Sequence, residues 1–276
     1  MNMTIGDKDF IRLRDYMHDH FGINLEKKRT LIEGRLGNTI AQEGFDGFTD
    51  FLDDAFADKT GHKIDTLISK LTTNYTYFYR EDTHYKFMVE TALPEWTAKI
   101  RNNDLRVWSA GCSSGEEPYT TAMVLNEYFG PNKSAWDCKI LATDLSPRVL
   151  KIAKDAVYPE EHLEKLPAGW EHKYFDKRKN QHDEVEYAIK PLIKNEVIFG
   201  QFNLMQPFTR FRKKFHIIFC RNVMIYFNNA TKTELTDKYF DALEPGGYLF
   251  IGMSETLSGI NPRFQQIKPA IYRKQA

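Results

Sequence analysis

Short apolar segments alternate with helix-like segments over the C-terminal two thirds of this chain. Four of them are β-rich and too short for helices: RVWSA (106–110), KILATDL (139–145), HIIFC (216–220) and YLFIGM (248–253). This alternation is typical of a mostly parallel sheet with helices on both faces, because parallel neighbours need a helix-length crossover. The pattern therefore predicts an α/β domain.

The N-terminal part of the chain shows helical periodicity instead. Apolar residues recur at the i, i+3, i+4, i+7 spacing of one helix face, for example at Ile64, Leu67, Ile68 and Leu71. No strand pattern interrupts these segments. We predict three parts: an all-helical N-terminal domain over 1–72, an inter-domain linker over 73–90, and the α/β domain over 91–276.

One stretch interrupts the α/β rhythm, at about 158–200. In EVEYAIK (184–190) apolar and polar residues alternate, which is typical of a half-exposed antiparallel strand. The preceding FDKRKNQHDE reads as a charged turn or hairpin tip. We therefore expect a small antiparallel β insertion on the α/β domain.

Composition restricts the function classes. The 276 residues include 38 Lys and Arg and 38 Asp and Glu, a balance that argues against a nucleic-acid partner. Cys112, Cys138 and Cys220 show no metal-ligand spacing, so we expect neither a metal site nor a disulfide framework. The sequence shows no signal-peptide core and no run of about 20 apolar residues. We expect a cytoplasmic monomer that does not insert into membranes.

A glycine-containing turn follows the first predicted strand, in VWSAGCSSGEEPYT (107–120). Gly111 and Gly115 are expected to let the backbone approach a ligand closely. Glu116 and Glu117 then open the next helix, where an anion such as a pyrophosphate would otherwise be favoured. Carboxylates at this position predict a neutral or cationic ligand and disfavour NAD.

Asp144 ends the second predicted strand, KILATD. An acid at this position can accept both hydroxyl groups of a ribose, although it can also cap the helix that begins in DLSPRVLKIAK. A phosphate-free nucleoside with a positive centre satisfies both this acid and the glutamates, and S-adenosylmethionine is such a molecule. We expect Glu117 to meet its ammonium group and Asn203 to hydrogen-bond its adenine.

Four segments together resemble the CheR-type chemoreceptor methyltransferases, the protein-glutamate O-methyltransferases of bacterial chemotaxis. They are TTNYTYFYRE (72–81), WSAGCSSGEEPYT (108–120), ILATDLSPRVL (140–150) and IIFCRNVMIYF (217–227). The resemblance covers nearly the whole chain. It implies a Rossmann-like methyltransferase domain with a small antiparallel β insertion, preceded by an all-helical domain. It also implies S-adenosylmethionine as cofactor, S-adenosylhomocysteine as product, and glutamates on the cytoplasmic helices of methyl-accepting chemotaxis receptors as acceptors.

The resemblance assigns roles to residues that match the family motifs. Arg80 and Tyr226 are the predicted catalytic residues, with Arg80 as a clamp for the acceptor carboxylate and Tyr226 beside the reacting methyl. The predicted cofactor-binding set is Asn74, Thr76, Arg80, Gly111, Glu117, Asp144, Asn203, Leu204, Arg221 and Asn222. Without the resemblance, the aromatic cluster around Arg80 reads as core, Arg80 as an ion-pair partner, and Asn222 as the cap of a turn.

Lys28 and Arg35 lie outside the apolar stripe of their helix and are the predicted receptor-binding residues; Arg29 is a further candidate. The family has a second arginine three residues after Arg35, where this chain has Asn38, and an ordinary solvated face is the alternative. The hairpin YFDKRKNQHDEVEY lacks the glycine found in members that bind a receptor C-terminal pentapeptide, which argues against such tethering in this chain.

No general base is required if the acceptor is a glutamate, because a glutamate carboxyl group has an ordinary pKa of about 4.3 and is ionised at neutral pH. We accordingly expect all eight histidines to be structural or on the surface. Two other functions stay open: methylation of another protein acceptor, and a receptor-docking or cofactor-sensing module without turnover. The Asn/Asp-Pro-Pro-aromatic motif of amino-methylating nucleic-acid enzymes is absent from CRNVMIY.

Overall fold

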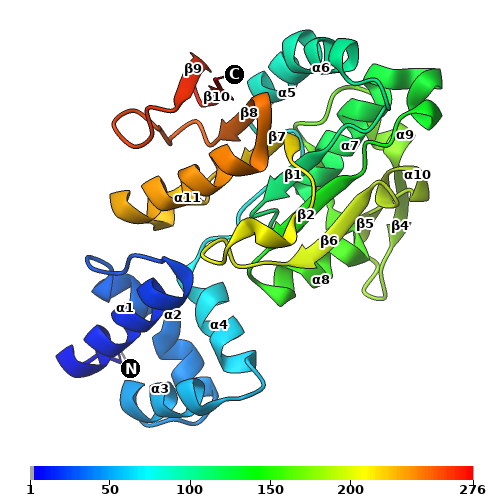
Figure 1. Cartoon of the computed structure of the whole chain (residues 1–276). Helices are drawn as coiled ribbons and strands as arrows, with labels where there is room; N and C mark the ends of the chain where they lie inside the picture. The colour runs from blue at the N-terminus through cyan, green and yellow to red at the C-terminus, as the bar shows by residue number, and fades with distance from the viewer. Residues whose placement is uncertain (1–2, 276) are drawn as a thin grey trace.

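The computed structural model describes residues 3–275. Four helices form the N-terminal domain: α1 (Asp7–Phe21), α2 (Arg29–Gln42), α3 (Phe48–Ala57) and α4 (His62–Leu71). Their apolar stripes meet in one buried core, in which Ile32, Leu36 and Leu67 are fully buried. The predicted all-helical N-terminal domain is therefore confirmed (Figure 1).

A seven-stranded sheet forms the centre of the second domain, in the order β6-β2-β1-β7-β8-β10-β9. The first five of these are parallel neighbours, and β10 and β9 add an antiparallel edge. The strands are β1 (Val107–Ala110), β2 (Ile140–Asp144), β6 (Val197–Gln201), β7 (Phe215–Cys220), β8 (Leu243–Ile251), β9 (Phe264–Lys268) and β10 (Ile271–Lys274). The predicted α/β class is confirmed.

Helices cover both faces of this sheet because its central strands are apolar on both sides. In β7, Ile217 and Phe219 point to one core, and Ile218 and Cys220 point to the other. On the first face lie α5 (Asp82–Phe87), the π-helical turn η1 (Met88–Ala92), α6 (Leu93–Lys99), α7 (Glu116–Phe129) and α8 (Pro147–Asp155). On the second face lies α11 (Asn229–Ala242).

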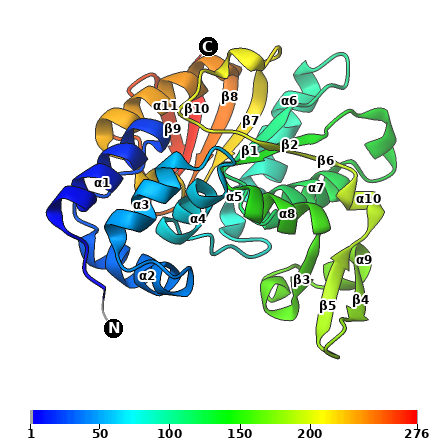
Figure 2. The same cartoon turned by 90° about the horizontal axis from the view of Figure 1, so that it is seen from below.

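The predicted β insertion is a separate three-stranded sheet, in the order β3-β5-β4 (Figure 2). Its strands are β3 (Val157–Pro159), β4 (Phe175–Lys179) and β5 (Val185–Ile189), accompanied by η3 (Glu160–Leu163) and α9 (Trp170–Tyr174). After α10 (Pro191–Lys194), β6 pairs with β2 in the large sheet, so the insertion ends earlier than predicted. The β4–β5 hairpin turns without glycine because Asp183 adopts a φ of 64°.

The N-terminal domain packs against the side of the second domain at which the carboxyl ends of the parallel strands lie (Figures 1 and 2). Asn24 N–H donates to the carbonyl of Tyr226 at 2.8 Å, and Arg148 donates to Ser69 Oγ at 3.3 Å. Leu145 and Phe227 also pack against the helical core. The linker that follows α4 therefore runs between two packed domains.

His216 at the start of β7 is predicted to make stability depend on pH. Its Nδ1 accepts the N–H of Arg106 at 2.9 Å, and burial, followed by the charge of Arg106, lowers its pKa from 6.5 to about 4. Between these values the unfolded chain binds a proton that the folded chain does not. The free energy of unfolding should therefore fall by about 3 kcal/mol for this group as pH drops from 6.5 to 4.

Denaturant unfolding of His216→Gln between pH 7 and 4 checks this expectation. The glutamine amide can still accept from Arg106, so the variant should lose less stability on acidification than the wild type. His182→Gln, at the exposed hairpin tip, is the matched control and should follow the wild type. Parallel pH curves for all three proteins would contradict the role of His216.

Candidate active site

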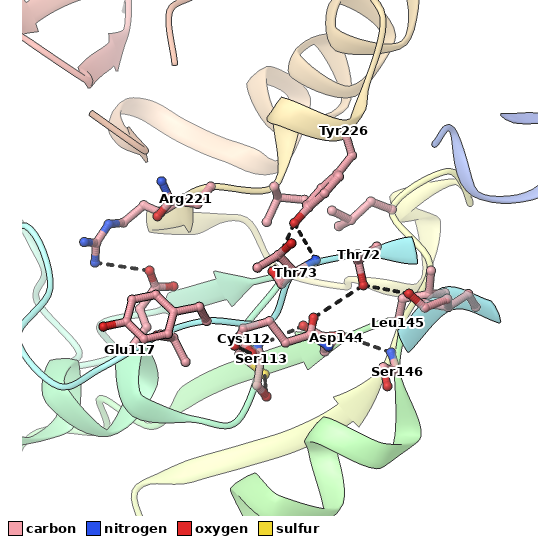
Figure 3. Close-up of a pocket in the computed structure, with 18 of the residues that line it drawn as sticks. Thr72, Thr73, Cys112, Ser113, Glu117, Asp144, Leu145, Ser146, Arg221 and Tyr226 are labelled. Carbon is pink, nitrogen blue, oxygen red and sulfur yellow. Dashed lines mark hydrogen bonds and ion pairs between the residues drawn. The ribbon is translucent and has the colours of Figure 1, made fainter. Parts of the chain in front are cut away.

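A cavity lies at the carboxyl ends of β1, β2, β6 and β7, which is where ligands bind in open α/β sheets (Figure 3). The linker after α4 and the end of α1 close its other side. It is lined by Phe21, Ile23, Ile68, Thr72–Tyr77, Arg80, Tyr85, Gly111–Ser113, Glu117, Asp144–Ser146, Phe202–Leu204, Arg221–Val223, Tyr226 and Phe227. All the residues predicted for catalysis and cofactor binding are therefore brought together around one cavity.

The two glycines of the β1–α7 loop are explained by backbone geometry and packing. Gly111 has a φ of 88°, and a Cβ at this position would lie 2.4 Å from Val223 Cγ2. Gly115 has a φ of 99°, and a Cβ there would lie 2.9 Å from the Cβ of Ala153. Gly115 does not line the cavity. From the sequence we expected both glycines to let the backbone approach a ligand. Of the two, only Gly111 lines the cavity and can serve that purpose.

Glu116 and Glu117 point in different directions. The Glu116 side chain is fully buried and accepts from Ser114 Oγ, and one of its oxygens lies 2.7 Å from His162 Nδ1. It does not line the cavity, so of the two carboxylates from which we predicted a neutral or cationic ligand, Glu116 does not contribute. Neighbouring residues on a helix point about 100° apart, and here only Glu117 faces the cavity.

Asp144 both supports the loop and faces the cavity. Its carboxylate accepts from Ser113 N–H at 2.8 Å and from Ser146 N–H at 3.0 Å (Figure 3). Ser146, and not Asp144, is the N-cap of α8, so Asp144 supports the start of this helix without being its cap. Burial raises the pKa of Asp144, although the backbone donors oppose the shift. The remaining lone pairs stay available to hydroxyl groups of a ligand.

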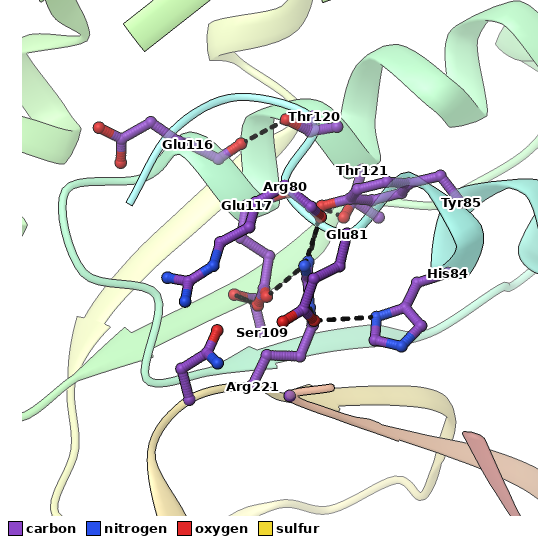
Figure 4. Close-up of polar contacts among 12 residues, drawn as sticks. Arg80, Glu81, His84, Tyr85, Ser109, Glu116, Glu117, Thr120, Thr121 and Arg221 are labelled. Carbon is purple, nitrogen blue, oxygen red and sulfur yellow. Dashed lines mark hydrogen bonds and ion pairs between the residues drawn. The ribbon is translucent and has the colours of Figure 1, made fainter. Parts of the chain in front are cut away.

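Arg221, at the end of β7, is the centre of a buried ionic cluster (Figure 4). Only 2% of its side chain is exposed. Its Nε lies 3.1 Å from Glu81 Oε2, and its Nη1 lies 3.2 Å from both Glu117 Oε2 and the Tyr85 hydroxyl. The remaining nitrogen, Nη2, donates to the carbonyl of Arg80. The guanidinium therefore has a partner on every nitrogen.

The cluster carries one excess negative charge, because Glu81 and Glu117 both face the single guanidinium of Arg221. Burial raises the pKa of Glu117, against the opposing effects of Arg221 and of the bond from Ser109 Oγ at 2.7 Å. Asp144 and Arg80 add one charge of each sign to the cavity wall. A cationic ligand is therefore the electrostatic complement of this site.

The linker forms one wall of the cavity. Ser113 Oγ donates to the carbonyl of Asn74 at 3.0 Å, and Arg80 Nη1 donates to the carbonyl of Tyr75 at 2.9 Å. Within residues 3–275, Arg80 forms no ion pair with a carboxylate, so it is not the structural ion-pair partner that the bare sequence suggested. Arg221 takes that role. Thr76 lines the same wall.

Tyr226 and Asn203 already have partners within the protein. The Tyr226 hydroxyl accepts from Thr73 N–H at 2.8 Å and donates to the Thr73 carbonyl at 3.0 Å. Asn203 Nδ2 donates to the carbonyl of His20 at 2.7 Å, and its Oδ1 accepts from Met205 N–H at 2.9 Å. The Asn203 side chain therefore joins the second domain to α1, and the Tyr226 hydroxyl joins it to the start of the linker. Leu204 lies beside Asn203 in the lining.

Sequence reasoning missed two carboxylates that shape the site. Glu81 is the partner of Arg221, and Glu255 accepts the N–H groups of Asn222, Ile225 and Gly252 at 3.0, 3.1 and 2.6 Å. Asn222 has a φ of 59°, which this clamp holds in place. Glu81 is the last residue of the TTNYTYFYRE motif, and Glu255 is the last residue of GMSE (252–255). The sequence therefore shows both carboxylates close to predicted site segments, but it does not show which residues they bond.

The two predicted receptor-binding residues differ in their surroundings. Lys28 is exposed. Arg35 is half-buried, and its guanidinium donates to the carbonyls of Lys70 and Thr72 at 3.1 and 3.0 Å and to Thr73 Oγ1 at 2.9 Å. Arg35 therefore holds the end of α4 and the start of the linker.

The sheet order, the glycine turn after β1, the acid at the end of β2 and the excess negative charge define a nucleoside-binding methyltransferase of the S-adenosylmethionine-dependent class. The family model of the CheR methyltransferase SAM-binding domain matches residues 74–273, and that of the CheR all-alpha domain matches residues 8–72. The chain therefore belongs to the CheR methyltransferase family, and S-adenosylmethionine is the ligand of its second domain.

Curated relatives match along almost the whole chain. A chemotaxis protein methyltransferase of Borreliella burgdorferi is 43% identical over 99% of this chain and 96% of its own length. Corresponding proteins of Pseudomonas putida and Escherichia coli are 33% and 31% identical, over 96% and 98% of this chain and 96% and 92% of their own lengths. These matches agree with the family resemblance of the four sequence motifs.

Residues 3–275 contain neither a metal-binding cluster nor a membrane-spanning helix. No group of three or more His, Cys, Asp or Glu side chains in this range is arranged to hold a metal ion. No helix in the same range is both long and apolar enough to cross a lipid bilayer.

Glu117 is predicted to make cofactor affinity depend on pH. An ammonium group bound beside Glu117 favours its ionised form, whereas burial raises its pKa in the free protein. Binding should therefore release a proton, and affinity for S-adenosylhomocysteine should rise with pH through the titration of Glu117. Glu117→Gln should weaken binding by about tenfold at pH 8 and remove this dependence.

Titration calorimetry in buffers of different ionisation enthalpy measures both the affinity and the proton release. Glu127→Gln, at the other end of α7 and paired with Lys173, is the matched control and should keep the wild-type pH profile. An unchanged profile in Glu117→Gln would exclude Glu117 as the ammonium ligand.

Proposed function

We propose that this chain transfers the methyl group of S-adenosylmethionine to glutamate side chains of methyl-accepting chemotaxis receptors, giving glutamate methyl esters. One observation carries the proposal: no histidine or lysine is found among the described residues that line the cavity. Its carboxylates Glu117 and Asp144 are engaged by Arg221, Ser109 and backbone donors. An acceptor that needs no deprotonation, such as a carboxylate, suits this site.

The bound cofactor supplies an electrophilic methyl group on a sulfonium. Arg80 is the proposed clamp for the acceptor carboxylate, because its guanidinium lines the cavity and keeps free donors after bonding to Tyr75. Its hold on the acceptor must stay moderate, since tight binding of the ground state alone does not lower the barrier. Tyr226 is proposed to lie beside the transferred methyl and to fix the start of the linker through Thr73.

Arg80→Ala tests this function directly. Loss of the clamp removes acceptor orientation, so kcat/KM for a receptor cytoplasmic fragment should fall by roughly a hundredfold or more. Tyr226→Phe keeps the ring and should cost less. Transfer of radiolabelled methyl, followed by alkaline release of methanol, detects the ester.

Three outcomes would count against the proposal. Near-normal turnover of Arg80→Ala would remove the clamp role. Label that is stable to alkali would indicate another acceptor group. Cofactor binding without any transfer to the receptor fragment would indicate a docking or sensing module.

We also propose that α2, with Lys28 at its N-cap and Arg35 in its second turn, faces the acidic helices of the receptor. Lys28 is exposed and free to approach such a helix. Lys28→Glu should therefore raise KM for the receptor fragment several-fold, while S-adenosylhomocysteine affinity stays unchanged. Arg35→Glu should in addition lower thermal stability, because Arg35 holds the end of α4.

Glu26→Lys is the charge control, since it adds positive charge at a neighbouring exposed position. It should leave KM unchanged or lower it. If Lys28→Glu weakened cofactor binding and receptor methylation equally, the docking role would be refuted.

A further inference from the structure

The main chain around Arg80 adopts an uncommon conformation. Its neighbours Tyr79 and Glu81 have φ angles of 62° and 56°, in the left-handed region that non-glycine residues rarely occupy. Such conformations persist where the surrounding structure holds them, and Tyr79 N–H is indeed fixed by Thr120 Oγ1 at 3.1 Å. The main chain on the other side of Arg80 needs a comparable restraint.

Arg221 and Glu81 supply that restraint. Arg221 donates through Nη2 to the carbonyl of Arg80 and through Nε to Glu81 Oε2. The second carboxylate oxygen of Glu81 accepts the N–H of Met253, in the loop after β8, at 3.1 Å. Glu81 thus ties the guanidinium of Arg221 to the loop after β8, while Arg221 holds the carbonyl of Arg80. Figure 4 shows Glu81, Arg221 and Arg80 side by side.

Glu81 is placed to act on its neighbours and not on a ligand. It does not line the cavity, and 15% of its side chain is exposed. His84 is fully buried next to it, with Nδ1 at 3.6 Å from Oε2. Burial, followed by the charge of Arg221, lowers the pKa of His84 to about 4. His84 is therefore neutral at pH 7, and Arg221 is the cation that faces Glu81.

We propose that Glu81 is a positioning residue: acting through Arg221, it fixes the main chain of Arg80 so that the Arg80 guanidinium meets the acceptor carboxylate in one place. The inference rests on the proposed function of Arg80. Without the Glu81 carboxylate, Arg221 retains Glu117 as its only carboxylate partner and can turn toward it. The carbonyl of Arg80 then loses a fixed donor.

Glu81→Gln tests the proposal with little change in size. With S-adenosylmethionine saturating, we expect kcat for the receptor fragment to fall about tenfold to a hundredfold. The Kd for S-adenosylhomocysteine should rise by a smaller factor, because the variant also removes the excess negative charge of the cluster. Because Glu81 acts through Arg80, adding Glu81→Gln to Arg80→Ala should lower turnover by less than about twofold further. Asp82→Asn is the matched control: Asp82 is the next carboxylate, pairs with surface Lys86 at 2.6 Å, and should not affect turnover.

Amide hydrogen exchange of the full chain provides a readout that does not need turnover. The peptide covering 77–84 should exchange at least about tenfold faster in Glu81→Gln than in the wild type or Asp82→Asn. Glu81→Asp keeps the charge and should restore part of both the protection and the kcat. Thermal unfolding verifies that each variant is folded.

The outcomes separate the two proposals. Three results would overturn the positioning role. The first is unchanged amide exchange of the 77–84 peptide in Glu81→Gln, and the second is a Glu81→Asp variant whose kcat and protection equal those of Glu81→Gln. The third is a double variant in which Glu81→Gln lowers the turnover of Arg80→Ala by as much as it lowers that of the wild type. A wild-type protein that forms no methyl ester would refute the proposed function instead, and the exchange data would then decide the positioning role by themselves.

Discussion

The site depends on one buried cation. Arg221 occupies the end of β7 with every nitrogen bonded, and its partners come from the linker, from α5 and from the first turn of α7. Removing one partner of a buried ion pair commonly costs about 3–5 kcal/mol, because the other charge stays buried and uncompensated. The Arg221 side chain therefore makes a large contribution to holding together segments that lie far apart in the sequence.

The same cluster explains the electrostatic character of the cavity. Two carboxylates share one guanidinium, so the pair formed by Glu81 and Glu117 keeps one uncompensated negative charge. Ser109 Oγ donates to Glu117 and the Met253 N–H donates to Glu81, and both bonds help to stabilise that charge. A ligand with a positive centre neutralises this remaining negative charge. The buried network thereby favours binding of a cationic cofactor.

The helical domain contributes to the cavity as well as packing beside it. Phe21, Ile23 and Ile68 line the cavity, and the Tyr226 hydroxyl bonds both backbone groups of Thr73. Arg35 holds the neighbouring carbonyl of Thr72 from α2. The position of the linker is thus fixed by contacts from both domains. Substitutions on α2 can therefore change the geometry of the cavity even though the substituted residue does not contact a ligand.

The fold was largely predictable because its signals are local. Apolar stripes on helices and apolar runs in strands are buried, so each can be recognised within its own segment. The β9 strand FQQIK was missed because four of its five residues are exposed and it shows no such run. The site was predicted as a set of motifs, and the structure brings those motifs around one cavity. The partners of Glu81, Glu116 and Glu255 were not predictable, since a hydrogen bond between distant segments leaves no periodic pattern.

The sequence by itself determined the two-domain α/β organisation, the family, and the charge types that meet at the strand ends. Tertiary structure alone decided which glutamate faces the cavity and which is buried against His162. It also decided that Arg221, and not Arg80, is the structural ion-pair partner. The physical reason is that side-chain direction and partner choice depend on how each helix is rotated and docked, and these are set by packing among segments far apart in the chain.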